Sequence, residues 1–199
     1  MLLNQKQVQV QLSRLIMVIS KNDNLIYKAD KEFHIEDAVL KKLPKIDKFE
    51  DFVKLANKYR NVFRNNFQND SFVPYEESLT FFSNLDSDPS RALYAISIKN
   101  DWIGHFGLKL FDSKTVLLDN ALRFSNKGSR DLFRKINLFF IDFILNFDSS
   151  LRIAIIIERN NLLARRLQKG LNVIEGSLEE YQNLGVDLKH FSLQFYSKD

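Results

Sequence analysis

The chain contains no cysteine, and this absence excludes several kinds of chemistry. Without thiols there can be no disulfide framework, no cysteine nucleophile and no cysteine-ligated metal site. Proline and glycine are scarce, at three and six residues, which argues against low-complexity sequence and long linkers. The longest apolar run near the N-terminus, Leu15 to Ile19, is too short for a signal peptide or a membrane span. We expect a protein of the reducing cytoplasm with no membrane partner.

The length and the net charge of the chain limit the number of domains and the kinds of binding partner. At 199 residues, of which 45% are hydrophobic and 27% charged, the chain fits one domain with a large core, with or without an extension. The net charge of +4 is mild and spread along the chain, so a polyanionic small molecule explains it as well as a nucleic acid does. The aromatic residues do not alternate with arginines in the order of an RNA-binding module, which makes nucleic acid an unfavoured partner. The three histidines lie far apart in the sequence, and no metal site is predicted.

The first part of the chain divides into an extension and the start of a folded domain. Residues 1–33 begin with alternating glutamines and contain two β-like runs about a polar turn, which suits a hairpin, although the first run could instead continue a helix. Residues 34–199 form the main domain, beginning with an edge strand from Ile35 to Leu43. A helix capped by Asp47 follows and ends near Asn65. A second helix opens at Pro74 and runs to about residue 84, because proline is tolerated in a first turn.

The rest of the chain predicts a mixed α/β (α+β) fold with a mostly antiparallel central sheet and helices on both faces. Short turns join three strands into an antiparallel meander, and a continuously apolar strand, RIAIII, belongs at the sheet centre. A helix crosses between this strand and the third meander strand, so the two should be parallel neighbours. The predicted elements are strands 92–99, 102–111 and 115–124, helix 131–147, strand 152–157, helix 162–169, and strands near 171–177 and 187–196.

The most informative stretch runs from Val116 to Gly176. Its first strand, VLLDNALR, enters an amphipathic helix through a turn that contains Gly128. A strand that feeds a helix in this way leaves unpaired backbone N–H groups, which suit a phosphate or a pyrophosphate. A tight turn without a ligand is the alternative. The stretch predicts a cofactor site.

Three groups of motifs resemble the GNAT superfamily of acyl-CoA-dependent N-acyltransferases over residues 34–196. The sequence YRN at 59–61, with Arg64 and the PYEE at 74–77, is similar to the helix pair of the branch that acetylates ribosomal proteins and amino sugars. The strand WIGHFG at 102–107 resembles the strand that carries the family's glycine motif. The KGS at 127–129 and the NLLARRL at 161–167 resemble the acyl-CoA motif and its following helix. The resemblance implies a parallel splayed strand pair in the sheet and acetyl-CoA as the acyl donor.

The resemblance also implies a donor site, with two departures from the family pattern. The residues that it assigns to acetyl-CoA are Leu122, Phe124, Lys127, Gly128, Ser129, Arg130, Asn161 and Arg165. Ser125 and Arg130 depart from the usual pyrophosphate loop, although the amides at the helix start can still bind phosphate. Gln168 stands where a tyrosine commonly protonates the leaving thiolate, so solvent or another donor must do so. Asn161 can equally be an ordinary helix cap.

For catalysis, attack on a thioester needs a neutral amine and hence a proton acceptor. Asp119 is the first candidate, with His105 second and Glu158 third. Asp119 could instead be a structural carboxylate that bonds backbone donors or Arg123. His105 could be a hydrogen-bonded structural residue, and Glu158 a helix cap or a partner of Arg159.

The sequence also suggests residues that would bind the amine substrate, and it leaves two hypotheses for the function. Arg60, Arg64 and Asn120 are expected at the acceptor site. The leading hypothesis is an N-acetyltransferase for a primary amine, with an amino-sugar nucleotide preferred over a protein N-terminus. The alternative is an inactive GNAT-fold module that binds CoA or a protein, in which residues 1–33 pair with a partner or with a second copy in a homodimer.

Overall fold

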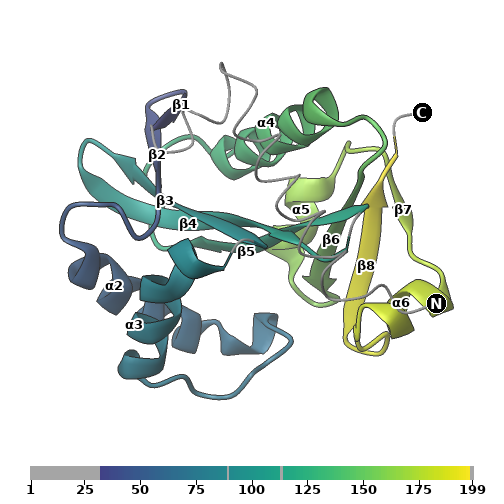
Figure 1. Ribbon diagram of the computed structural model, residues 1–199, viewed down its shortest axis with the longest axis horizontal. Coiled ribbons are helices and arrows are strands. Elements are labelled where there is room, and N and C mark those ends of the chain that lie inside the picture. Colours follow the sequence, from purple (N-terminus) through teal and green to yellow (C-terminus); the bar gives the residue numbers. More distant parts are fainter. Residues whose placement is uncertain (1–31, 89, 113, 198–199) are drawn as a thin grey trace.

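The computed structural model describes residues 32–88, 90–112 and 114–197, and these form one eight-stranded sheet flanked by helices (Figure 1). The strand order is β1-β2-β3-β4-β5-β6-β8-β7, and only β5 and β6 are parallel. The strands are β1 (Phe33–Ile35), β2 (Ala38–Lys42), β3 (Arg91–Ile98), β4 (Asp101–Leu110), β5 (Thr115–Arg123), β6 (Arg152–Glu158), β7 (Val173–Glu175) and β8 (Phe191–Tyr196). The helices are α2 (Phe49–Val62), α3 (Tyr75–Ser83), α4 (Leu132–Phe147), α5 (Leu162–Gln168) and α6 (Leu178–Asn183), with 3-10 turns η2 (Arg64–Asn66) and η3 (Asn84–Ser87).

The helices cover both faces of the sheet. Helix α4 lies on one face, where its apolar residues at helical spacing are buried against the strands, and Phe140 stacks on Phe106 of β4 at 5.0 Å. Helices α2 and α3 cover the opposite face over β3 to β5, and α6 covers the same face near β6 and β8 (Figure 1). The two faces therefore have separate cores, and the sheet lies between them.

The mixed fold with a mostly antiparallel sheet is confirmed, and so is its central arrangement. The meander of β3, β4 and β5 is antiparallel, helix α4 follows it, and the continuously apolar β6 pairs in parallel with β5 at the sheet centre. Short helix α5 also follows as predicted.

Four details of the prediction were wrong. The expected edge strand from Ile35 to Leu43 is a hairpin, because the chain reverses through Glu36, whose φ is 56°; β1 is the edge and β2 lies inside it. Asp47 does not cap α2, since the cap position is Lys48 and no side chain bonds there. Helix α6 was missed, although Ser177 and Glu180 form a capping box that begins it. The last strand is shorter than predicted.

The predicted hairpin in the N-terminal extension lies almost wholly outside the described residues, so the division after residue 33 stays a prediction. Within the described ranges, no helix is long and apolar enough to cross a membrane.

Candidate functional site

The two parallel strands at the sheet centre separate halfway along their length. β5 and β6 pair from Thr115 opposite Arg152 to Leu118 opposite Ile155, and the remaining half of each strand is unpaired with the other. β6 stays paired with β8, whereas none of the described strands pairs with the edge of β5 that faces β6 there. We call this region the β5–β6 opening. An unpaired strand edge presents backbone donors and acceptors to an extended ligand.

A β-bulge in β5 marks the point of separation. On β4 the register advances two residues, from His105 to Gly107, while on β5 it advances three, between Leu122 and Asp119. The extra residue lies at Asn120, which has a φ of 52°. Asparagine tolerates this left-handed conformation better than other non-glycine residues do. The bulge bends β5 away from its former direction and so lets the strands part.

Because of the extra residue, the side chains that follow the bulge point to the opposite face of the sheet from the one that regular alternation would give them. Asp119 belongs to the face covered by α2 and α3, and in a regular strand Arg123, four residues on, would share that face. Instead the Arg123 guanidinium lies 5.6 Å from the centre of the Phe133 ring, on the α4 face. The alternative in which Arg123 pairs with Asp119 is therefore wrong.

Asp119 lies beside the opening with one oxygen engaged. Its Oδ2 accepts a hydrogen bond from Asn120 Nδ2 at 2.7 Å and lies 3.6 Å from Arg91 Nη2. Among the described residues its Oδ1 has no partner, and the side chain is 29% exposed. Arg91 is at the start of β3 and stacks over Phe81 at 5.2 Å. Nothing in the sequence pointed to Arg91, because the two residues are far apart in the chain.

His105 is enclosed on the α2 and α3 face. Its residue is 4% exposed, and its ring lies 5.5 to 6.2 Å from those of Phe52, Phe82 and Phe124. Burial lowers the pKa of His105 to about 4, against the opposing effect of a hydrogen bond to the backbone of Asn120. The imidazole is therefore neutral near pH 7, and its hydrogen bond to the backbone of Asn120 supports the bulge from the face covered by α2 and α3.

Glu158, the third candidate base, is half-buried at the end of β6. Within the described part of the chain it forms no ion pair, so the expected pairing with Arg159 is absent. The cap of α5 is Asn161 instead.

The turn between β5 and α4 presents a set of free backbone donors. Gly128 has a φ of 82°, which reverses the chain before the helix. The N–H groups of five residues, which we call the loop amides, donate to no atom of the described chain: Asn126, Gly128, Ser129, Arg130 and Asp131. Amides grouped at a helix start suit an anionic oxygen cluster such as a pyrophosphate.

Charged side chains border this turn. Lys127 pairs with Asp101 of β4, and the Ser129 hydroxyl donates to Glu36 at 2.7 Å. Arg130 is exposed. The two basic side chains Lys127 and Arg130 thus lie at this turn, although Lys127 already has an acidic partner.

The other predicted donor residues fall into two groups. The side chains of Leu122 and Phe124 are buried in the core beneath α2 and α3, so that only their backbone can contact a ligand in the opening. Asn161 uses its side chain to cap α5, accepting from the Ala164 N–H at 3.0 Å. Arg165 is exposed on α5 and reaches the Arg159 carbonyl at 3.5 Å.

Gln168 ends α5 as a buried polar residue. It is 7% exposed, and its Oε1 has no hydrogen-bond partner in the described structure. An amide oxygen can accept a hydrogen bond but cannot supply a proton to a thiolate. Gln168 therefore cannot act as an acid.

The two arginines expected at the acceptor site differ in their surroundings. Arg60 donates to the carbonyl oxygens of Asn69 and, at 2.8 Å, of Ser71, and it stacks on Phe67 at 5.2 Å. Its hydrogen-bonding groups hold the segment that connects α2 to α3. Arg64 is exposed in η2.

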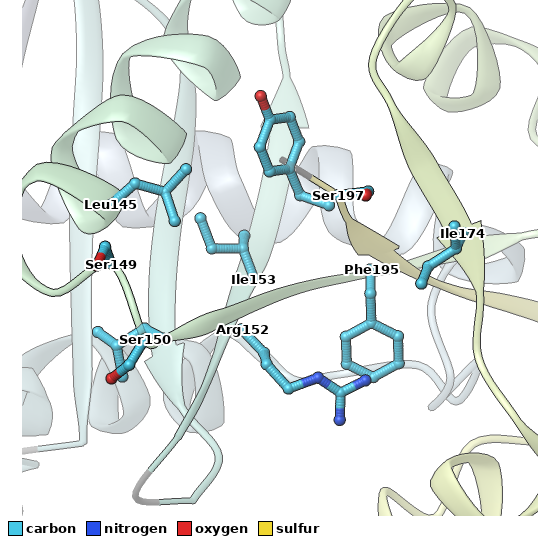
Figure 2. A pocket seen from close by; sticks show the side chains of 10 residues that line it. Leu145, Ser149, Ser150, Arg152, Ile153, Ile174, Phe195 and Ser197 are labelled. Carbon is cyan, nitrogen blue, oxygen red and sulfur yellow. The ribbon is translucent and has the colours of Figure 1, made fainter. Parts of the chain in front are cut away.

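A cavity of about 300 Å³ lies at the opposite end of β6 (Figure 2). Arg152 and Phe195 form one wall and Ile174 of β7 another, but the Arg152 cation already pairs with Glu180 and lies 4.0 Å from the Phe195 ring centre. It contains none of the predicted site residues. The described residues also contain no cluster of three or more metal-ligating side chains.

Solved structures with a similar fold exist. N-acetyltransferase PseH from Campylobacter jejuni, in complex with acetyl coenzyme A, superposes with a TM-score of 0.57 at 14% identity, covering 81% of this chain and 99% of that one. RimL, a ribosomal-protein α-N-acetyltransferase in complex with coenzyme A, gives 0.59 at 11% identity, covering 81% and 93%. The chain has the GNAT fold. The Microcin C7 self-immunity acetyltransferase MccE, in complex with acetyl-CoA and AMP, gives 0.58 at 14% identity, covering 82% and 93%. No protein-family model and no curated protein matches the sequence.

Proposed function

We propose that this GNAT-fold protein is an N-acetyltransferase that transfers an acetyl group from acetyl-CoA to a primary amine. The observation that carries the proposal is the β5–β6 opening with the loop amides at its end, because together they offer an unpaired strand edge and a phosphate-binding turn. Structural neighbours with this fold have been solved with acetyl-CoA or CoA.

In the proposed reaction the pantetheine arm pairs with the free edge of β5 and the pyrophosphate bonds the loop amides. Backbone N–H groups near the bulge polarise the thioester carbonyl. The amine attacks the carbonyl carbon, the C–N bond forms, and the C–S bond breaks to release a thiolate. Holding both substrates in the opening makes this attack effectively unimolecular.

Asp119 is the proton acceptor in this proposal. Its Oδ1 is free of described partners, and Asn120 and Arg91 orient the carboxylate through the other oxygen. The proton of the attacking amine passes to Oδ1 directly or through one water. Because Gln168 cannot donate a proton, the CoA thiolate is protonated by solvent. His105 is assigned to the support of the bulge.

For the acceptor, the first class to test is an amino-sugar nucleotide, which the sequence resemblance favours over a protein N-terminus. The test is isothermal titration of the full chain with CoA, followed by acetyl transfer to a panel of amino-sugar nucleotides, polyamines and peptides. Failure of CoA to bind at high micromolar concentration would refute the proposal.

A second candidate is a GNAT-fold module that binds CoA without turnover. The buried Gln168 in place of an acid favours it. Stabilisation by CoA with no acetylation of any amine in the panel would support this alternative.

A further inference from the structure

Arg123 lies against the turn that precedes α4 and contacts three of its carbonyl groups. Its Nε donates to the Ser125 oxygen at 2.7 Å, its Nη2 to the Lys127 oxygen at 2.9 Å, and its Nη1 reaches the Ser129 oxygen at 3.4 Å. A guanidinium carries five N–H donors in a fixed plane, so one side chain can serve several acceptors at once.

These contacts determine where the neighbouring N–H groups point. In a trans peptide the carbonyl of one residue and the N–H of the next point in opposite directions. Carbonyls 125, 127 and 129 face Arg123, and therefore the N–H groups of Asn126, Gly128 and Arg130 face away from it. These are three of the five loop amides that have no partner in the described chain.

The guanidinium is itself held in place by the sheet and α4. It lies over the Phe133 ring, which is 3% exposed, and that ring occupies the space above Gly104 of β4, the residue opposite Arg123. The glycine lets the ring approach the sheet, and the ring supports the cation. The β5 bulge places Arg123 on this face in the first place.

We propose that Arg123 is a positioning residue that turns three of the loop amides, those of Asn126, Gly128 and Arg130, outward for the CoA pyrophosphate. This inference rests on the proposed function and concerns the same donor site. Arg123 acts through the backbone and need not touch the ligand.

The test compares Arg123→Lys and Arg123→Met in the full chain, with Kd measured by titration. The ligands are CoA, dephospho-CoA, which keeps the pyrophosphate, and pantetheine, which lacks it. Lysine keeps the charge but not the planar fork, and methionine keeps only an unbranched stem. Since hydrogen bonds to charged groups are at stake, both variants should raise the Kd of CoA and dephospho-CoA about tenfold to a hundredfold. The Kd of pantetheine should stay within about twofold of wild type, below the effect of one lost hydrogen bond.

Three results would overturn the inference. R123K that binds CoA as wild type does would mean that charge alone matters. An equal loss of pantetheine and CoA binding would indicate general damage to β5. Lys127→Met, which removes a charge from the same turn without breaking the Arg123 contacts, should cause a smaller loss; a loss as large as that of R123M would also refute it. If wild type does not bind CoA, the proposed function fails before any variant is compared.

Discussion

Replacing Gly104 by alanine is a stringent test of the geometry beneath the proposed donor site. A methyl group at this position would lie 2.4 Å from the Leu122 carbonyl oxygen and 2.6 Å from Cζ of Phe133. Real Cβ contacts are not that short, so one or both neighbours must move. The Phe133 ring is packed in the α4 core, and the Leu122 oxygen belongs to the backbone of β5, next to the opening. Neither can move at little cost.

The expected magnitude follows from this crowding. Overpacking a core costs about 1–3 kcal/mol, and the upper half of that range applies because backbone must shift. For a domain of this length each kcal/mol corresponds to about 2–4 °C in Tm, so G104A should lose about 4–12 °C in a thermal unfolding scan. Gly185→Ala is the matched control: Gly185 has a φ of 62°, but no atom of the described residues lies within 4 Å of the added methyl group. The free energy of unfolding of this variant should fall only by the cost of placing alanine in a left-handed conformation, about 1–2 kcal/mol. A fall for G104A no larger than that for G185A would refute the reasoning.

Three further predictions concern the site and the C-terminal sheet. Asp119→Asn should lower kcat/KM for acetyl transfer about a hundredfold while the Kd of CoA stays at the wild-type value, and an unchanged rate would exclude Asp119 as the base. Asn120→Gly should preserve stability because glycine adopts the bulge conformation freely, whereas Asn120→Val should destabilise by about 1–2 kcal/mol in urea unfolding. Burial raises the pKa of Glu175, but hydrogen bonds from Tyr181 and Ser192 outweigh it and hold that pKa below its usual value of 4.5. The Glu175 carboxylate thus stabilises the fold above pH 4.5, and this stabilisation is lost as the pH falls. Glu175→Gln should therefore lower the free energy of unfolding at pH 7 and lower it less at pH 4. An equal loss at both pH values would contradict the assigned hydrogen bonds from Tyr181 and Ser192.

The central elements of the fold were predictable because their patterns are local. Helix α4 shows apolar residues at helical spacing, β6 is continuously apolar, and short polar turns separate β3, β4 and β5. The β1–β2 hairpin was not predictable in this way, because its reversal at Glu36 has no glycine or proline to mark it. The capping box at Ser177 was a readable signal that was overlooked.

The site was harder to predict than the fold, for a physical reason. Strand alternation assigns Asp119 and Arg123 to one face, and a single extra residue at Asn120 reverses that assignment for everything after it. The partner of Asp119 comes instead from β3, and such a long-range contact leaves no trace in one sequence. The same bulge gives Arg123 access to the turn before α4. Asp119, Asn120 and the turn were singled out from sequence as candidates and their roles stay predictions, whereas the contacts that surround them in the structure were not predicted.

Amide hydrogen exchange in the presence and absence of CoA would test the central claim most directly, because it reports on individual backbone donors. If the β5–β6 opening binds CoA, exchange should slow at the five loop amides and along the free edge of β5 after the bulge. Little change is expected at the cavity beside Arg152 and Phe195 (Figure 2). Protection at that cavity, or no protection at the loop amides under saturating CoA, would contradict the account.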